Sequence, residues 1–77
     1  MTKKEEFLEY IQSNITSGSR LECVQRQIST NETFVHNYFF LRVESGMQYF
    51  QANFDDALVN TKGDIEILGY TAFAPTA

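Results

Sequence analysis

Two side chains in the sequence have the chemistry of a nucleophile and a general base: the single cysteine, Cys23, and the single histidine, His36. In enzymes that use such a pair, the imidazole draws the proton from the nucleophile, and a carboxylate usually orients the imidazole. Asn37 and Tyr38 follow His36, which makes a catalytic interpretation worth weighing. Nothing local in the sequence brings the two side chains together, however, and lone thiols are often buried as small apolar groups. We therefore expect no catalytic residues, and we expect His36 to be half-buried in a sheet.

The segment from Asp55 to Glu66 spans the twelve positions of a calcium-binding loop. Such a loop needs oxygen ligands at its third and fifth positions and glycine at its sixth, where this sequence has Ala57, Val59 and Asn60. The four glycines of the chain are scattered, so no phosphate-binding or dinucleotide-binding motif is present. We therefore expect neither a metal ion nor a cofactor.

The net charge of −4 comes from the second part of the chain. Basic and acidic residues balance from Met1 to Val43, whereas from Glu44 onward Lys62 is the single base against five acids. Because like charge repels a phosphate backbone, the charge disfavours direct nucleic-acid binding and favours a basic protein partner. Asp55 and Asp56 are the expected contacts for such a partner.

The composition indicates one small domain over residues 1–77, with residues 74–77 as a frayed tail. A single cysteine excludes an internal disulfide, and the first residues lack the apolar segment of a secretory signal. No stretch approaches the roughly 18 apolar residues that a membrane span requires. These features predict a cytoplasmic protein without a membrane partner.

The first element is predicted to be a helix from about Lys3 to Thr16. Thr2 and Glu5 have the spacing of a capping box, and the dipeptide Ser17-Gly18 supplies a stop. Apolar residues recur along one side of this helix at Phe7, Leu8, Ile11 and Ile15.

The next segment, residues 19–29, fits either a short second helix or a strand, and the strand is slightly favoured. As a strand it would lie at the edge of a sheet, because Arg26 and its neighbouring glutamines discourage unwanted pairing. Residues 29–32 then form a turn.

The strongest strand pattern runs from Phe34 to Val43, and the residues from Met47 to Phe54 alternate again. With Ser45-Gly46 as the turn between them, these two runs predict a hairpin. One or two helical turns are expected in 55–63 and a last strand in 64–73. The predicted fold is therefore α+β, with the N-terminal helix packed on a meander of three or four antiparallel strands.

This hairpin would have two apolar faces, whichever of its two plausible registers it adopts. The expected core face carries Val35, Phe39, Leu41, Val43, Phe50, Ala52 and Phe54. The other face is neither clean core nor clean surface, and on it we expect the partner contacts Phe34, Tyr38, Phe40, Arg42, Met47 and Tyr49.

One 14-residue helix is too small to cover both faces. The cover would be the rest of the chain, a second copy of the protein or a different protein. We therefore expect a non-enzymatic binding or regulatory protein, such as an inhibitor of the phage-type antagonist kind that blocks a basic nucleic-acid-binding partner, in a homodimeric or monomeric form. The alternative is a small-molecule binding module or minimal enzyme that uses a pocket between helix and sheet, with His36, Tyr38 and Tyr49 as polar contacts.

Overall fold

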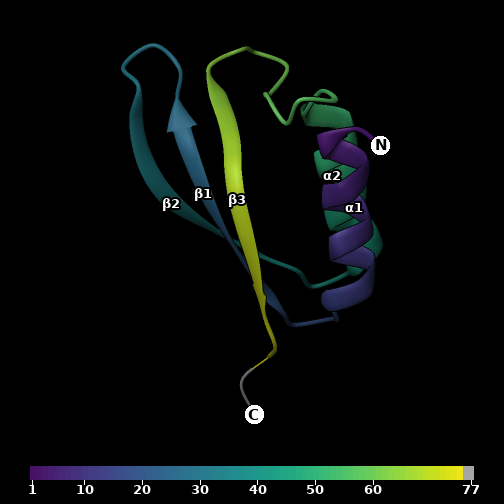
Figure 1. Ribbon diagram of the computed structural model, residues 1–77. Coiled ribbons are helices and arrows are strands. Elements are labelled where there is room, and N and C mark those ends of the chain that lie inside the picture. Colours follow the sequence, from purple (N-terminus) through teal and green to yellow (C-terminus); the bar gives the residue numbers. More distant parts are fainter. Residues whose placement is uncertain (76–77) are drawn as a thin grey trace.

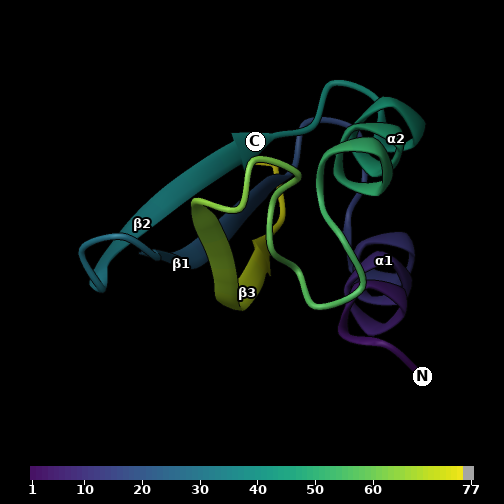
Figure 2. The same cartoon turned by 90° about the horizontal axis from the view of Figure 1, so that it is seen from above.

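The computed structural model describes residues 1–75 and has two layers, a three-stranded antiparallel sheet and a layer of two helices (Figure 1). The elements in chain order are α1 (Lys3–Asn14), β1 (Arg20–Gln27), β2 (Glu32–Phe39), α2 (Val43–Asn53) and β3 (Ile65–Phe73). Seen from above, both helices lie on the same side of the sheet (Figure 2). The expected α+β class is confirmed. Neither helix is long and apolar enough to cross a membrane.

Helix α1 begins with the predicted capping box. The Thr2 hydroxyl accepts from the Glu5 amide at 3.1 Å, and the Glu5 carboxylate accepts from the Thr2 amide at 2.9 Å. Phe7 and Ile11 are fully buried on the side that faces the sheet layer. The helix ends two residues before the predicted boundary.

In the predicted C-terminal tail, residues 74 and 75 lie outside any helix or strand. The last two residues of that tail, 76–77, lie outside the described part of the chain.

Strands β1 and β2 form a hairpin around residues 28–31, close to the predicted turn at 29–32. Asn31 takes a left-handed conformation there, with φ of 61°, which asparagine tolerates better than most residues. The slight preference for a strand in 19–29 is therefore correct. Its placement at the edge of the sheet is wrong, because β1 lies between β2 and β3 and buries Leu21, Cys23 and Gln25.

The predicted hairpin at Ser45-Gly46 is wrong, because these two residues lie inside α2. The apolar residues of this region, Val43, Met47, Phe50 and Phe54, recur at intervals of four, three and four, which is helical spacing. Phe50 and Phe54 are buried and Val43 and Met47 pack beside the core. The apolar residues in 47–54 were therefore assigned the two-residue period of a strand, whereas they follow the period of a helix.

Residues 55–63 form tight turns in place of the predicted helical turns. Leu58 is buried in a left-handed conformation with φ of 61°, and short bridges join Phe54 to Asn60 and Val59 to Glu66. The predicted last strand is confirmed as β3. It pairs with β1, so the sheet order is β2-β1-β3, and the predicted meander is wrong.

Aromatic rings hold the two layers together. The Phe7 ring meets the Phe50 ring edge-on at 4.8 Å and the Tyr70 ring at 4.7 Å, which links α1 to α2 and to β3. The Tyr10 hydroxyl accepts from the Ala72 amide at 2.9 Å. These contacts place α1 over β3, while α2 packs beside the end of β2.

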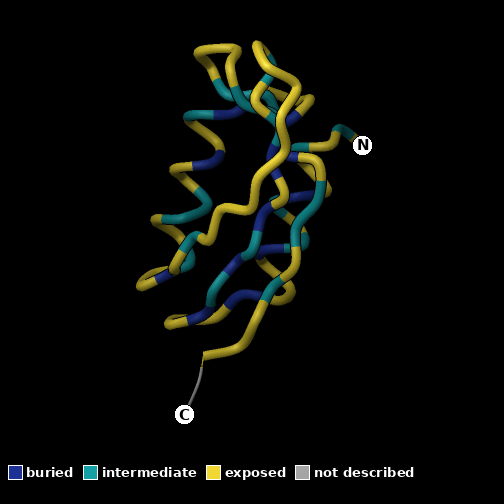
Figure 3. Tube along the Cα trace, turned by 90° about the vertical axis from the view of Figure 1, so that its left-hand side faces the viewer, coloured by how far each residue is buried: buried dark blue, intermediate teal, exposed yellow. Residues whose placement is uncertain are grey.

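The other face of the sheet is not covered by either helix. In β1 this face carries Arg20 and Arg26, and both have local partners: Arg20 lies over the Phe73 ring at 4.2 Å, and Arg26 pairs with Glu66 at 2.6 Å. β2 is exposed along nearly its whole length (Figure 3).

Candidate protein-binding surface

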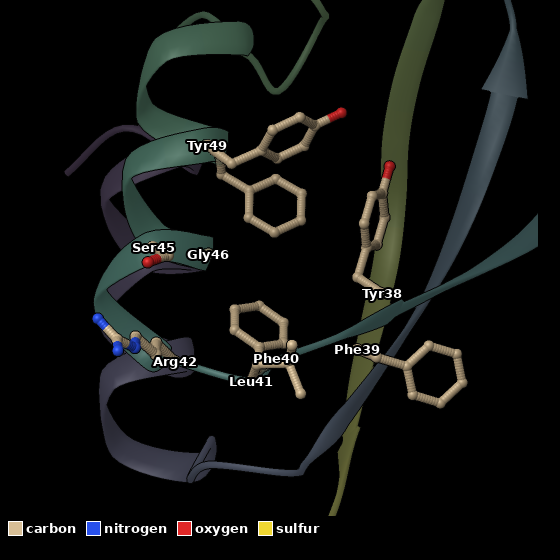
Figure 4. Close-up of a pocket in the computed structure, with 9 residues that line it drawn as sticks. Tyr38, Phe39, Phe40, Leu41, Arg42, Ser45, Gly46 and Tyr49 are labelled. Atoms are coloured by element: carbon tan, nitrogen blue, oxygen red, sulfur yellow. The ribbon is translucent and has the colours of Figure 1, made fainter.

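A groove lies between the C-terminal end of β2 and the first turns of α2 (Figure 4). Its volume is about 660 Å³, and it is partly open to solvent. Most of its lining is aromatic or aliphatic, and we call it the β2–α2 groove: Tyr38, Phe39, Phe40, Leu41, Arg42, Ser45, Gly46, Tyr49 and Phe50.

The floor of the groove is packed and buried. The Phe40 and Phe50 rings are stacked with centroids 6.2 Å apart, and each side chain is at most 3% exposed. Tyr38 meets Phe50 edge-on at 4.8 Å. Because the floor belongs to the protein core, it offers a partner a fixed surface.

The rim of the groove consists of apolar side chains that the chain leaves in water. Leu41 is 84% exposed, Phe39 is 74% exposed and Tyr49 is 48% exposed. Figure 4 shows Phe39 pointing away from α2, toward the far side of the sheet. The Ser17 hydroxyl donates to the Leu41 carbonyl at 2.7 Å, so the backbone at Leu41 is held in place.

Polar groups in the groove are few. The Tyr38 hydroxyl accepts from Gln25 at 2.8 Å, and burial raises the pKa of Tyr38, so this phenol stays neutral at physiological pH. Arg42 is the one charged residue of the lining and is exposed. The groove therefore suits an apolar occupant with a minority of polar groups.

The structure brings together four of the eight partner contacts expected from sequence: Tyr38, Phe40, Arg42 and Tyr49 line the groove. Phe34 lies farther along β2 and is 38% exposed. Met47, on α2, packs partly buried against the core and does not line the groove.

The two expected acidic contacts lie beyond the end of α2, outside the groove. The Asp55 carboxylate accepts from the amides of Ala57 and Val59, at 2.9 Å and 3.0 Å, and so shapes the local turn. Asp56 is exposed, and its carbonyl accepts from the Lys4 amide at 3.1 Å. No helix follows these acids before β3, so neither of them caps the helical turns that were expected in 55–63.

Sequence reasoning missed the two most prominent rim residues. Phe39 and Leu41, together with Val35, were assigned to the core face, but Val35 is 55% exposed and the other two are more exposed still. β2 has the opposite orientation because Tyr38 lies opposite the fully buried Leu21 of β1. Once α2 is recognised as a helix, the alternation in β2 assigns Phe39 to the uncovered face.

Cys23 and His36 do lie directly opposite each other on neighbouring strands. Burial raises the pKa of the Cys23 thiol to about 12, and the nearby Glu22 carboxylate adds to the effect. A catalytic cysteine needs the opposite shift. His36 is exposed, with its ring 4.4 Å from that of Tyr38, so the expectation of a half-buried histidine is wrong. Within residues 1–75, no three His, Cys, Asp or Glu side chains cluster closely enough to hold a metal ion.

Comparison of the chain with protein-family models, with curated proteins and with solved structures finds no match. The function must therefore be argued from the surface itself.

Proposed function

We propose that this chain is a non-enzymatic binding protein that acts by protein–protein contact through the β2–α2 groove and its apolar rim. The observation that carries the proposal is the exposure of Leu41 and Phe39, 84% and 74%, beside a packed aromatic floor. Isolated exposed apolar side chains are common on proteins, but Leu41 borders a hollow lined by further aromatic rings, and the Phe39 ring is exposed on the adjoining, uncovered face of the sheet.

The energetic reason is burial of apolar surface. Covering one such side chain contributes roughly 1.5–3 kcal/mol relative to leaving it in water. Interfaces also concentrate their binding free energy in aromatic and arginine residues near the centre. Tyr38, Tyr49 and Arg42 supply those residue types here.

We also propose that the partner is basic. Of the five acids in the second part of the chain, Glu66 pairs with Arg26, the Asp55 carboxylate accepts from backbone amides and the Asp64 carboxylate accepts from the Asn60 side chain. Glu44 and Asp56 are exposed. A partner that uses these two charges would bind more weakly as salt rises, because exposed charges are screened over about 8–10 Å at physiological ionic strength.

The test is quantitative affinity purification from the native host with two matched variants. Leu41→Asp places a charge on the rim of the groove, and Leu68→Asp makes the same change at a half-exposed position on β3, away from the groove. We expect specific partners to be lost with Leu41→Asp and retained with Leu68→Asp. The same partners at the same yield with both variants would refute the proposal.

The groove volume also supports a second function, binding of a small molecule, since ligand pockets commonly occupy about 300–1,000 Å³. Of the polar contacts expected for this alternative, Tyr38 and Tyr49 line the groove and His36 does not. A metabolite that raises the melting temperature of the native protein, but not of a Tyr49→Ala variant that lacks one of these two polar contacts, would favour this function.

A further inference from the structure

The two outer edges of the sheet differ in how their backbone groups are satisfied. Along β3, the Ile67 amide donates to the Leu58 carbonyl at 2.9 Å, and the Ile65 carbonyl accepts from the Asn60 amide at 2.9 Å. Farther along, the Ala72 amide donates to the Tyr10 hydroxyl at 2.9 Å. The β3 edge is therefore covered at both ends by its own chain.

The β2 edge is open. Near the end of β2, the Phe40 amide donates to the Ser19 carbonyl at 3.0 Å, so Phe40 directs its backbone groups inward. In an antiparallel pair this direction alternates. The residues that direct their amide and carbonyl groups outward are therefore Thr33, Val35, Asn37 and Phe39, and within residues 1–75 none of these backbone groups has a hydrogen-bond partner.

The usual protections of an edge strand are missing from β2. The strand is eight residues long and contains neither proline nor lysine, and the one irregularity in the sheet lies between β1 and β3. Such an edge is a template for pairing with another strand. Val35 and Phe39, two of the four residues with unpaired backbone groups, also have exposed apolar side chains.

We propose that the occupant of this edge is a second copy of the chain, whose β2 pairs antiparallel with β2 about a two-fold axis at Asn37. The result is a continuous six-stranded sheet with all four helices on one side. This inference rests on the proposed function and names the partner for the end of β2. The two-fold axis places Asn37 opposite the partner's Asn37, so that their backbone amide and carbonyl groups form two hydrogen bonds.

Complementarity of side chains selects this register. Val35 comes to lie opposite the partner's Phe39, which pairs two exposed apolar side chains on the uncovered face of the sheet. Glu32, the one charged residue of β2, comes to lie near the partner's Arg42, where the chain bends from β2 into α2.

The neighbouring registers lack this match. Moving the axis to His36 places Glu32 opposite the partner's Phe40 and Val35 opposite the partner's Asn37. Moving it to Tyr38 places Asn37 opposite the partner's Phe39 and leaves Glu32 unpaired, because residue 44 lies in α2.

The test is sedimentation equilibrium of the purified full-length protein and a matched pair of variants. Asn37→Pro removes one outward amide without removing a bond of the β1–β2 ladder, whereas Asn37→Ala keeps that amide. We expect twice the chain mass of 8.9 kDa for the native protein and for Asn37→Ala. We expect at least about tenfold weaker association for Asn37→Pro, because both central hydrogen bonds are lost.

A charge exchange tests the register and replaces the proline variant if that variant does not fold. Glu32→Arg should weaken association, and the double variant Glu32→Arg with Arg42→Glu should restore it. A native protein that is monomeric at all concentrations overturns the inference, as does a dimer unaffected by Asn37→Pro and by the charge exchange. Either result leaves the proposed function standing if Leu41→Asp still abolishes capture of a different protein.

Discussion

The Phe40 ring lies so close to Gly46 that a β-carbon built on this glycine would stand 2.1 Å from Cε2 of the ring and 2.3 Å from Cδ2. Real β-carbons do not approach other atoms so closely. Gly46 is therefore required inside α2 because it lets the helix approach the end of β2, and this approach forms the floor of the β2–α2 groove.

Replacing Gly46 with alanine tests this packing. Helix propensity alone predicts that Gly46→Ala stabilises the protein by up to about 1 kcal/mol. The contact with Phe40 predicts the opposite sign, a loss of about 1–3 kcal/mol, because the buried ring must move. The measurement is urea unfolding, with the exposed neighbour Ser45→Ala as control. A Gly46→Ala variant more stable than the native protein would contradict the packing.

The same contact explains why α2 was not predicted from sequence. Ser45-Gly46 is a common turn dipeptide, and the dense aromatic residues before and after it are typical of strands. Gly46 is needed because α2 packs closely against Phe40, and this contact cannot be recognised from the sequence. The helical spacing of Val43, Met47, Phe50 and Phe54 was the signal that could have corrected the prediction.

Elements with local signals were predicted well. The capping box of α1, the turn near residue 30 and the final strand all depend on residues close together in the chain. Strand order and the orientation of β2 depend on pairing between distant residues, such as Leu21 with Tyr38 and Leu21 with Ala72. For that reason the high density of apolar and aromatic residues around β2 was predicted, but the exposed residues Val35, Phe39 and Leu41 were assigned to the core face.

Lys4 joins the start of α1 to the end of α2. Its ammonium donates to the Phe54 carbonyl at 3.0 Å and to the Gln51 carbonyl at 3.3 Å, where the helix dipole is negative. We expect Lys4→Met to lower the free energy of unfolding by about 1 kcal/mol. Lys3→Met, at the exposed neighbouring position, should change it little. Equal effects of the two variants in urea unfolding would show that the helix-end contact contributes nothing.

Cys23 is expected to be inert in the folded protein. With a pKa of about 12, against an ordinary value of 9.0, its thiolate fraction near pH 8 is on the order of a thousandfold below that of a free cysteine. The native protein should therefore react with a disulfide reagent orders of magnitude more slowly than the protein in urea. Rapid labelling of Cys23 under native conditions would instead indicate an activated thiol and reopen the catalytic interpretation.

The capping box makes a small contribution to stability that depends on pH. Hydrogen bonds from the Thr2 backbone and then from the Thr2 side chain lower the pKa of Glu5 below its ordinary value of 4.5. Because the folded-state pKa is the lower one, this stabilisation is present above about pH 4.5 and is lost as pH falls through the folded-state value. The stability difference between the native protein and Glu5→Gln should shrink over that range. A difference independent of pH would contradict this assignment.

Amide hydrogen exchange along β2, followed by NMR at high and at low protein concentration, shows directly whether a second copy pairs with this strand. If the end of β2 is a contact surface filled by a second copy, the outward amides of Val35, Asn37 and Phe39 exchange slowly at high concentration. They then exchange rapidly on dilution, while the inward amide of Tyr38 stays protected. Rapid exchange of all three outward amides at every concentration would show that no second copy pairs with β2.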